Sequence, residues 1–220
     1  MKTRIKICGL IREQDVDAAV AAGADAIGFV LYEQSARHVT LTRATALARR
    51  LPPFVTPVLL FVNAQAQEVS KACSSIPNAT LQFHGDETPA QCWAASGQGA
   101  HPYLRAARIP LGDRASEFDL LKYAQDYSQA QAILLDAHVD GYGGGGKAFN
   151  WSLLPPSVNA HLVLGGGLSA ANVADGIRQV RPRARSLAVD VSSGVEVSRG
   201  IKDPEKIIQF VAAVRAAEHS

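Results

Sequence analysis

Residues 4–30 read RIKICGLIREQDVDAAVAAGADAIGFV, and the order of apolar and polar residues in this stretch decides the fold. Two short apolar runs, Arg4–Ile7 and Ala26–Val30, stand on either side of Arg12–Ala22, where apolar residues recur with helical period. Gly23 follows directly, and a glycine in that position commonly ends a helix. The stretch therefore predicts a strand, a helix and a second strand, the unit from which parallel sheets are built.

The same alternation repeats to the end of the chain. It predicts eight strands, at Arg4–Ile7, Ala26–Val30, Pro57–Val62, Thr80–Phe83, Tyr103–Ala107, Ala132–Leu135, Leu162–Leu164 and Ser186–Val189. It predicts helices at Arg12–Ala22, Thr42–Leu51, Ala66–Ser74, Pro89–Ala95, Phe118–Tyr127, Ala170–Val180 and Pro204–Ala217, with only a short turn after Trp151. Eight parallel strands, each followed by a crossover connection, are typical of a (β/α)8 TIM barrel. We therefore expect one such domain over residues 1–220.

Three of the predicted helices begin beside residues that commonly cap a helix N-terminus. Thr42 opens an Ala-rich run, while Thr88 and Asp203 each precede a proline. Oxygen atoms of such side chains accept hydrogen bonds from backbone N–H groups that have no partner inside the helix. These residues are therefore expected to fix where the helices start.

Charge and hydropathy exclude several classes of partner. The 22 basic and 20 acidic residues nearly cancel and form no run of like charge, so neither a nucleic acid nor a membrane surface is expected as a partner. The first residues, MKTRIKICGL, lack the apolar stretch of a signal peptide, and no segment is apolar enough to cross a membrane. We expect a cytoplasmic protein, monomeric or homodimeric, that binds a small anionic molecule.

The cysteine pattern argues against a disulfide framework and against a zinc site. Cys8, Cys73 and Cys92 are an odd number, contain no CxxC pair and have no histidines at metal-binding spacing. Cys73 and Cys92 stand at apolar positions of predicted helices and are expected to fill the core. Reduced thiols and no metal are the prediction.

In a TIM barrel the chemistry lies at the C-terminal ends of the strands. The residues that follow the predicted strands are Cys8, Arg37, Asn63, His84, Asp136, Gly165–Gly167 and Asp190–Gly194. Read together, the segments KICGL, GADAIGFV, SARHV, LLFVN, LQFHGDE, LLD, GGGL and VDVSSGVE resemble the phosphoribosylanthranilate isomerase family over essentially the whole chain. The resemblance implies an Amadori rearrangement of N-(5'-phosphoribosyl)anthranilate to 1-(2-carboxyphenylamino)-1-deoxyribulose 5-phosphate in tryptophan biosynthesis, without cofactor or metal.

The resemblance assigns the catalytic pair and the group that binds the substrate carboxylate. Cys8 matches the general base, although a lone cysteine beside a strand is more often a small buried hydrophobe. Asp136 matches the general acid, although an aspartate after a strand commonly caps the next helix. Arg37 matches the residue that holds the anthranilate carboxylate, for which a planar guanidinium is suited. Ala36 stands where the family usually has proline, which removes a rigid turn.

Neighbouring residues support these assignments. Side chains alternate along a strand, so Lys6 is expected below Cys8 on the same face, where a buried cation favours the thiolate. Asp190, at the end of the strand that closes the barrel, is expected either to pair with Lys6 or to orient the phosphate loop. His84 and Gln82 share a face and are expected to line the substrate site, where a hydrogen-bonding role for His84 is favoured over catalysis.

Two glycine-containing runs are expected to bind the substrate phosphate through backbone N–H groups. They follow the seventh and eighth strands, where TIM barrels commonly hold phosphate, and they contain Gly165, Gly166, Gly167, Ser192, Ser193 and Gly194. The segment Gly141–Gly146, within DGYGGGGK, predicts a mobile loop over the site.

Two rival functions stay open. A dual-substrate isomerase that also handles the histidine-pathway aminoaldose is disfavoured, because that relative uses aspartates at two strand ends and Cys8 stands at the first one here. A phosphate-binding barrel without catalysis is the other rival, since fold alone does not prove function.

Overall fold

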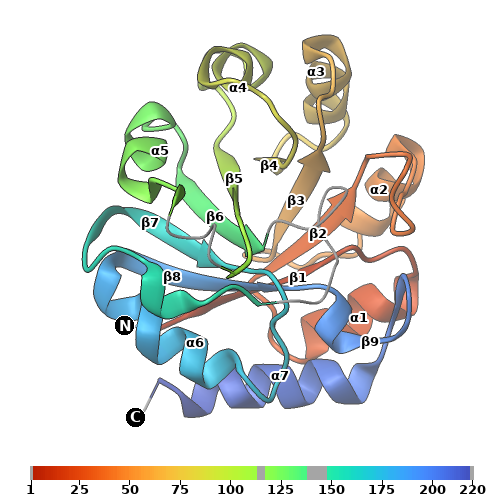
Figure 1. Ribbon diagram of the computed structural model, residues 1–220. Helices are drawn as coiled ribbons and strands as arrows, with labels where there is room; N and C mark the ends of the chain where they lie inside the picture. The colour runs from red at the N-terminus through yellow and green to blue at the C-terminus, as the bar shows by residue number, and fades with distance from the viewer. Residues whose placement is uncertain (1, 113–116, 138–147, 219–220) are drawn as a thin grey trace.

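The computed structural model describes residues 2–112, 117–137 and 148–218. Eight parallel strands form a closed barrel in sequence order (Figure 1). The strands are β1 (Arg4–Cys8), β2 (Ala26–Val30), β3 (Thr56–Phe61), β4 (Thr80–Phe83), β5 (Tyr103–Ile109), β6 (Ala132–Ala137), β7 (Val158–Leu164) and β8 (Ala184–Val191). The predicted (β/α)8 barrel is therefore confirmed. The predicted mobile loop at Gly141–Gly146 lies outside the described residues.

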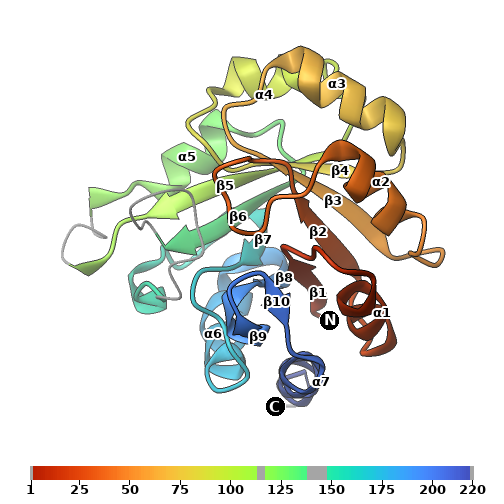
Figure 2. The same ribbon diagram turned by 90° about the vertical axis from the view of Figure 1, so that its right-hand side faces the viewer.

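Helices surround the barrel in the order expected from the sequence (Figures 1 and 2). They are α1 (Glu13–Ala21), α2 (Leu41–Ala48), α3 (Ala66–Ser75), α4 (Pro89–Ala95), α5 (Leu120–Asp126), α6 (Val173–Val180) and α7 (Pro204–Ala216). Between β6 and β7 the described residues form only the 3-10 turn η2 (Trp151–Leu153), as predicted. The segment after β8 adds the 3-10 turn η4 (Ser193–Val195) and a small antiparallel pair, β9 (Glu196–Ser198) and β10 (Ile201–Lys202), which the sequence did not predict.

Several strands extend beyond the predicted bounds. β7 begins at Val158 instead of Leu162, because Val158 and His161 pair with Ala184 and Ser186 of β8. The apolar pattern does not predict this part of β7, because the side chain of His161 faces solvent. The backbone hydrogen bonds of a strand do not depend on side-chain polarity. The strand bounds therefore depend on pairing with a neighbouring strand.

One of the three cap predictions is wrong. The N-cap of α2 is Thr40, whose hydroxyl accepts from the Arg43 backbone N–H, and Thr42 lies inside the helix. Thr88 and Asp203 cap α4 and α7 as predicted. The error arose because the sequence offers two threonines, Thr40 and Thr42, separated only by Leu41.

The core has two parts, one inside the barrel and one between barrel and helices. The larger, outer part includes Cys73 of α3 and Cys92 of α4, both buried as predicted. The barrel interior carries charged and polar side chains among its apolar ones, including buried Lys6 and Gln82. No helix among the described residues is long and apolar enough to cross a membrane.

Candidate active site

Lys6 and Asp190 form a buried ion pair directly beside Cys8. β1 and β8 are neighbours with Lys6 opposite Asp190, and Lys6 Nζ lies 2.8 Å from Asp190 Oδ1. Burial alone would lower the pKa of Lys6, but the charges of Asp190 and Cys8 raise it above its usual value. Lys6 is therefore a permanent cation, and its predicted pairing with Asp190 is confirmed.

The environment of Cys8 both favours and opposes its ionisation. Its side chain is buried, and this burial raises the pKa of the thiol, whereas the charge of Lys6 lowers it. Burial is the larger effect, so the pKa of Cys8 is raised overall. The expected direction of the Lys6 effect is confirmed, and burial outweighs it in the ligand-free protein. Gly28 on β2 makes room for the thiol, because a Cβ there would lie 2.7 Å from Cys8 Sγ.

Asp136 is held by a histidine that lies two strands away around the barrel. His84 follows β4, and its Nε2 atom lies 2.9 Å from Asp136 Oδ2, while its Nδ1 atom lies 3.0 Å from Gln82 Nε2. With the Gln82 amide donating to Nδ1, the Nε2–H group donates to the carboxylate. Both ring nitrogens of His84 therefore have partners, which favours the supporting hydrogen-bonding role expected from the sequence.

Arg37 is held by Glu196, which Lys202 holds in turn, and sequence reasoning assigned neither residue. It lies in the loop between β2 and α2, and its Nε and Nη2 atoms donate to Glu196 Oε1 and Oε2 at 2.7 and 2.8 Å. Lys202 Nζ donates to Glu196 Oε1 at 2.8 Å. All three side chains are buried. Glu196 stands in the VDVSSGVE segment, but only the fold shows that the carboxylate returns to meet the guanidinium.

The glycines after β7 bring that loop against the candidate acid. Gly166 and Gly167 adopt left-handed φ angles of 70° and 66°. A Cβ at Gly166 would lie 2.6 Å from the Ala137 backbone nitrogen and 2.9 Å from Asp136 Oδ1. Any other residue would therefore push the loop away from Asp136, besides being strained at this φ.

The segment after β8 packs against the β7 loop and against β1. A Cβ at Gly194 would lie 1.9 Å from the Leu168 carbonyl oxygen, so the two loops meet at backbone distance. Ser192 Oγ donates to the Cys8 carbonyl at 3.0 Å, and Ser193 begins η4. The structure thus brings Gly166, Gly167, Ser192, Ser193 and Gly194 to the same end of the barrel as Cys8 and Asp136.

Comparison with known proteins accounts for this arrangement. A family model described as N-(5'phosphoribosyl)anthranilate (PRA) isomerase matches residues 5–213. This chain belongs to the phosphoribosylanthranilate isomerase family. The N-(5'-phosphoribosyl)anthranilate isomerase of Methylibium petroleiphilum is 62% identical over 218 residues, covering 99% of this chain and 96% of that protein. The family and the isomerase function predicted from the sequence are confirmed.

Solved structures of the family share the fold at lower identity. The phosphoribosyl anthranilate isomerase of Thermus thermophilus is 30% identical, with a TM-score of 0.83 over 97% of this chain and 99% of that chain. A second isomerase structure, in complex with reduced 1-(o-carboxyphenylamino)-1-deoxyribulose 5-phosphate, is 34% identical, with a TM-score of 0.79 over the same shares of the two chains. That ligand carries both a phosphate and an aromatic carboxylate.

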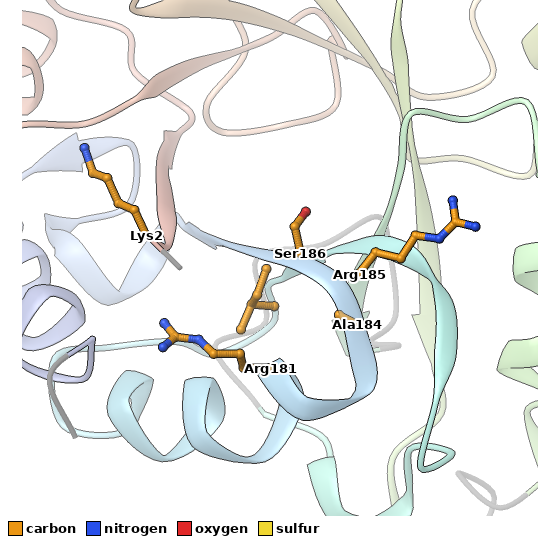
Figure 3. Close-up of a pocket in the computed structure, with 6 residues that line it drawn as sticks. Lys2, Arg181, Ala184, Arg185 and Ser186 are labelled. Carbon is orange, nitrogen blue, oxygen red and sulfur yellow. The ribbon is translucent and has the colours of Figure 1, made fainter.

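Two hollows of the barrel lie away from the family's strand-end chemistry. One of about 100 Å³ is lined by Lys2, Arg181 and Arg185 at the start of β1 and β8 (Figure 3). The other, of about 410 Å³, lies between α5 and β7. Both stand apart from Cys8 and Asp136, and in TIM-barrel enzymes the N-terminal face of the barrel serves stability and not chemistry. Among the described residues, no group of three or more histidine, cysteine or acidic side chains is arranged to hold a metal ion.

Proposed function

We propose that this chain isomerises N-(5'-phosphoribosyl)anthranilate with Cys8 as general base and Asp136 as general acid. The observation that carries the proposal is that Cys8 and Asp136 lie at the same end of the barrel, each beside a residue that interacts with it. Cys8 lies beside the Lys6–Asp190 pair, and Asp136 is held by His84. A base with a cation beside it and an orientated carboxyl group are what ring opening followed by proton transfer needs.

The reaction then runs in two proton transfers. Asp136, which must be protonated when the substrate is bound, gives that proton to the furanose ring oxygen as the bond from that oxygen to C1 breaks, which leaves a C1–nitrogen double bond. The Cys8 thiolate next removes the proton from C2, and the bonding electrons form an enolamine that tautomerises to the ketone. Lys6 stabilises the thiolate form of Cys8, because its charge lowers the pKa of the thiol. Substrate bound over Cys8 would place its anionic and aromatic groups beside the thiol.

The substrate is anchored at its two anionic ends. Arg37 binds the anthranilate carboxylate, and the backbone N–H groups of Gly166, Gly167 and Ser192–Gly194 bind the phosphate. The ligand of the related structure carries the same two groups, which supports the assignment. Glycines with positive φ and a 3-10 turn both leave backbone N–H groups free for an anion.

A direct assay tests the function. Purified protein is added to freshly made phosphoribosylanthranilate, and the decay of its fluorescence is followed with EDTA present. We expect turnover that EDTA does not slow, and that Cys8→Ser and Asp136→Asn each abolish. A wild-type protein without turnover would support the rival of a non-catalytic phosphate-binding barrel. Turnover of the histidine-pathway aminoaldose in the same preparation would support the dual-substrate rival.

The setting of the enzyme is part of the proposal. A biosynthetic isomerase with reduced thiols fits a cytoplasmic location, and all three cysteines are free in the structure. Either a monomer or a homodimer is compatible with a site built within one barrel. Light scattering during size-exclusion chromatography distinguishes the two states.

A further inference from the structure

The guanidinium of Arg37 is held from one side by Glu196. The two hydrogen bonds at 2.7 and 2.8 Å use the edge formed by Nε and Nη2. A guanidinium carries five N–H donors in one plane, so a second edge, formed by Nη1 and the other hydrogen of Nη2, stays available. No hydrogen bond joins Nη1 to the described residues. A second planar carboxylate therefore fits on that edge with two parallel bonds.

The cluster formed by Arg37, Glu196 and Lys202 has an uncompensated positive charge. Arg37 and Lys202 contribute two cations and Glu196 one anion, and the side chains are only 8%, 0% and 6% exposed for Arg37, Lys202 and Glu196. Burial opposes ionisation of Glu196, but the hydrogen bond from Arg37 and the charge of Lys202 hold its pKa below the usual value. Buried charge is unfavourable unless it is paired. One further anion would complete the pairing.

The same cluster fixes Arg37 relative to the proposed base and phosphate loop. Gly9 follows Cys8, and a Cβ at Gly9 would lie 2.5 Å from Arg37 Cδ, so the arginine stem packs directly on this glycine. Lys202 Nζ also donates to the carbonyl and hydroxyl oxygens of Ser192, at 3.1 and 3.2 Å. The guanidinium is therefore tied to both neighbouring strand ends.

We propose that Glu196 is a positioning residue that turns the open edge of Arg37 toward the substrate and thereby selects substrates that carry a planar carboxylate. Lys202 completes the device by keeping the cluster positive overall. This inference rests on the proposed function, because it concerns the carboxylate end of the same substrate. Glu196 acts only through Arg37 and does not touch the reacting atoms.

Glu196→Gln tests the proposal, because glutamine keeps the volume but replaces one accepting oxygen with an NH₂ donor. That donor faces either Nη2 of Arg37 or, in the other orientation, Nε of Arg37 together with Lys202 Nζ. Calorimetry compares reduced 1-(o-carboxyphenylamino)-1-deoxyribulose 5-phosphate with its phenylamino counterpart, which lacks the carboxylate. We expect the variant to bind the carboxylated probe about tenfold more weakly and the other probe within about twofold of wild type. With substrate, KM rises while kcat is largely retained.

Glu87→Gln is the matched control. Glu87 is also buried and accepts a hydrogen bond from an arginine, Arg105 Nη1, at 2.9 Å. Its loss is expected to lower Tm without changing the ratio of the two affinities. Should Glu196→Gln fail to fold, Glu196→Asp keeps the charge but shortens the reach, and the same selective loss is expected in smaller degree.

Two outcomes would overturn the inference. Equal weakening of both probes would show that Glu196 only maintains the loop. Tighter binding of the carboxylated probe in Glu196→Gln would show that Glu196 competes with the substrate for Arg37. Failure of the proposed function has a different signature, because the wild-type protein would then neither turn over the substrate nor prefer the carboxylated probe.

Discussion

His84 Nε2 lies 2.9 Å from Asp136 Oδ2, although His84 follows β4 and Asp136 lies on β6, which are not adjacent strands. The bond spans the end of the barrel and fixes the orientation of the carboxylate. A second bond, from Ala137 N–H to Asp136 Oδ1 at 3.0 Å, fixes the other oxygen. Asp136 is therefore a pre-orientated group and not a solvated helix cap.

Asp136→Asn is expected to lower kcat by at least ~10²-fold, the loss typical of a missing acid catalyst. The amide keeps the shape of the side chain, so fold and affinity for the product analogue should be retained. Circular dichroism and calorimetry check both. Near-normal turnover in this variant would contradict the assignment of the acid.

Lys6 and Asp190 are expected to change the reactivity of Cys8 in opposite directions. Lys6 lowers and Asp190 raises the pKa of Cys8, so Lys6→Met should slow alkylation by iodoacetamide at pH 8 and Asp190→Asn should speed it. Mass spectrometry of the peptide that spans Cys8 measures the rate. Equal rates in both variants would show that the pair does not tune the thiol.

All three thiols should react slowly in the ligand-free protein. Cys8, Cys73 and Cys92 are 5%, 4% and 0% exposed, and burial raises the pKa of each, that of Cys92 to about 12. Cys8 is only slightly more exposed than Cys73. We still expect loss of activity to follow modification of Cys8 alone, and a bound product analogue to protect it. Activity that survives full labelling of Cys8 would exclude a thiolate base.

Arg37→Ala is expected to have two separate effects. Binding of carboxylated analogues should weaken by roughly 1.5–3 kcal/mol, while analogues without the carboxylate are unaffected. Removing one partner of a buried ion pair should also lower the free energy of unfolding by about 3 kcal/mol. Ligand titration and urea denaturation measure the two effects independently. Equal weakening of both ligand types would mean that Arg37 shapes the loop.

The stabilising contribution of Glu196 should be lost in acid. Its pKa is lowered in the folded state, so its contribution to stability is present above the unfolded value of about 4.3 and is lost as the pH falls through the folded value. Urea denaturation at a series of pH values from about 6 downward measures the free energy of unfolding. This free energy should fall less steeply with falling pH in Glu196→Gln than in the wild type. An unchanged slope would mean that the carboxylate is equally ionised in both states.

The cap of α2 offers a matched pair of substitutions. Thr40→Ala removes the hydroxyl that accepts from the Arg43 N–H and should lower the free energy of unfolding by about 1 kcal/mol. Thr42→Ala lies inside the helix, where alanine is the better helix former, and should be neutral or slightly stabilising. Thermal denaturation distinguishes them, and the reverse order would restore Thr42 as the cap.

The sequence by itself determined the number and order of the barrel strands and of the helices between them. Hydrophobic period and turn residues are local properties, so runs such as Ala26–Val30 and Pro89–Ala95 were predicted at their observed bounds. Alternation along β1 also predicted the buried Lys6 beneath Cys8, and barrel closure predicted its pairing with Asp190. These inferences need only periodicity and topology.

The tertiary structure decided what the site residues touch. Glu196 meets Arg37 across 159 positions of sequence, and His84 meets Asp136 across 52, and no local pattern encodes such contacts. The net shift in the pKa of Cys8 also depended on the fold. Burial acts through all the atoms that surround the thiol, whereas the charge of Lys6 comes from a single residue. The sequence therefore determined which groups stand at the strand ends. Packing in three dimensions determined their hydrogen-bonding partners and the pKa of Cys8.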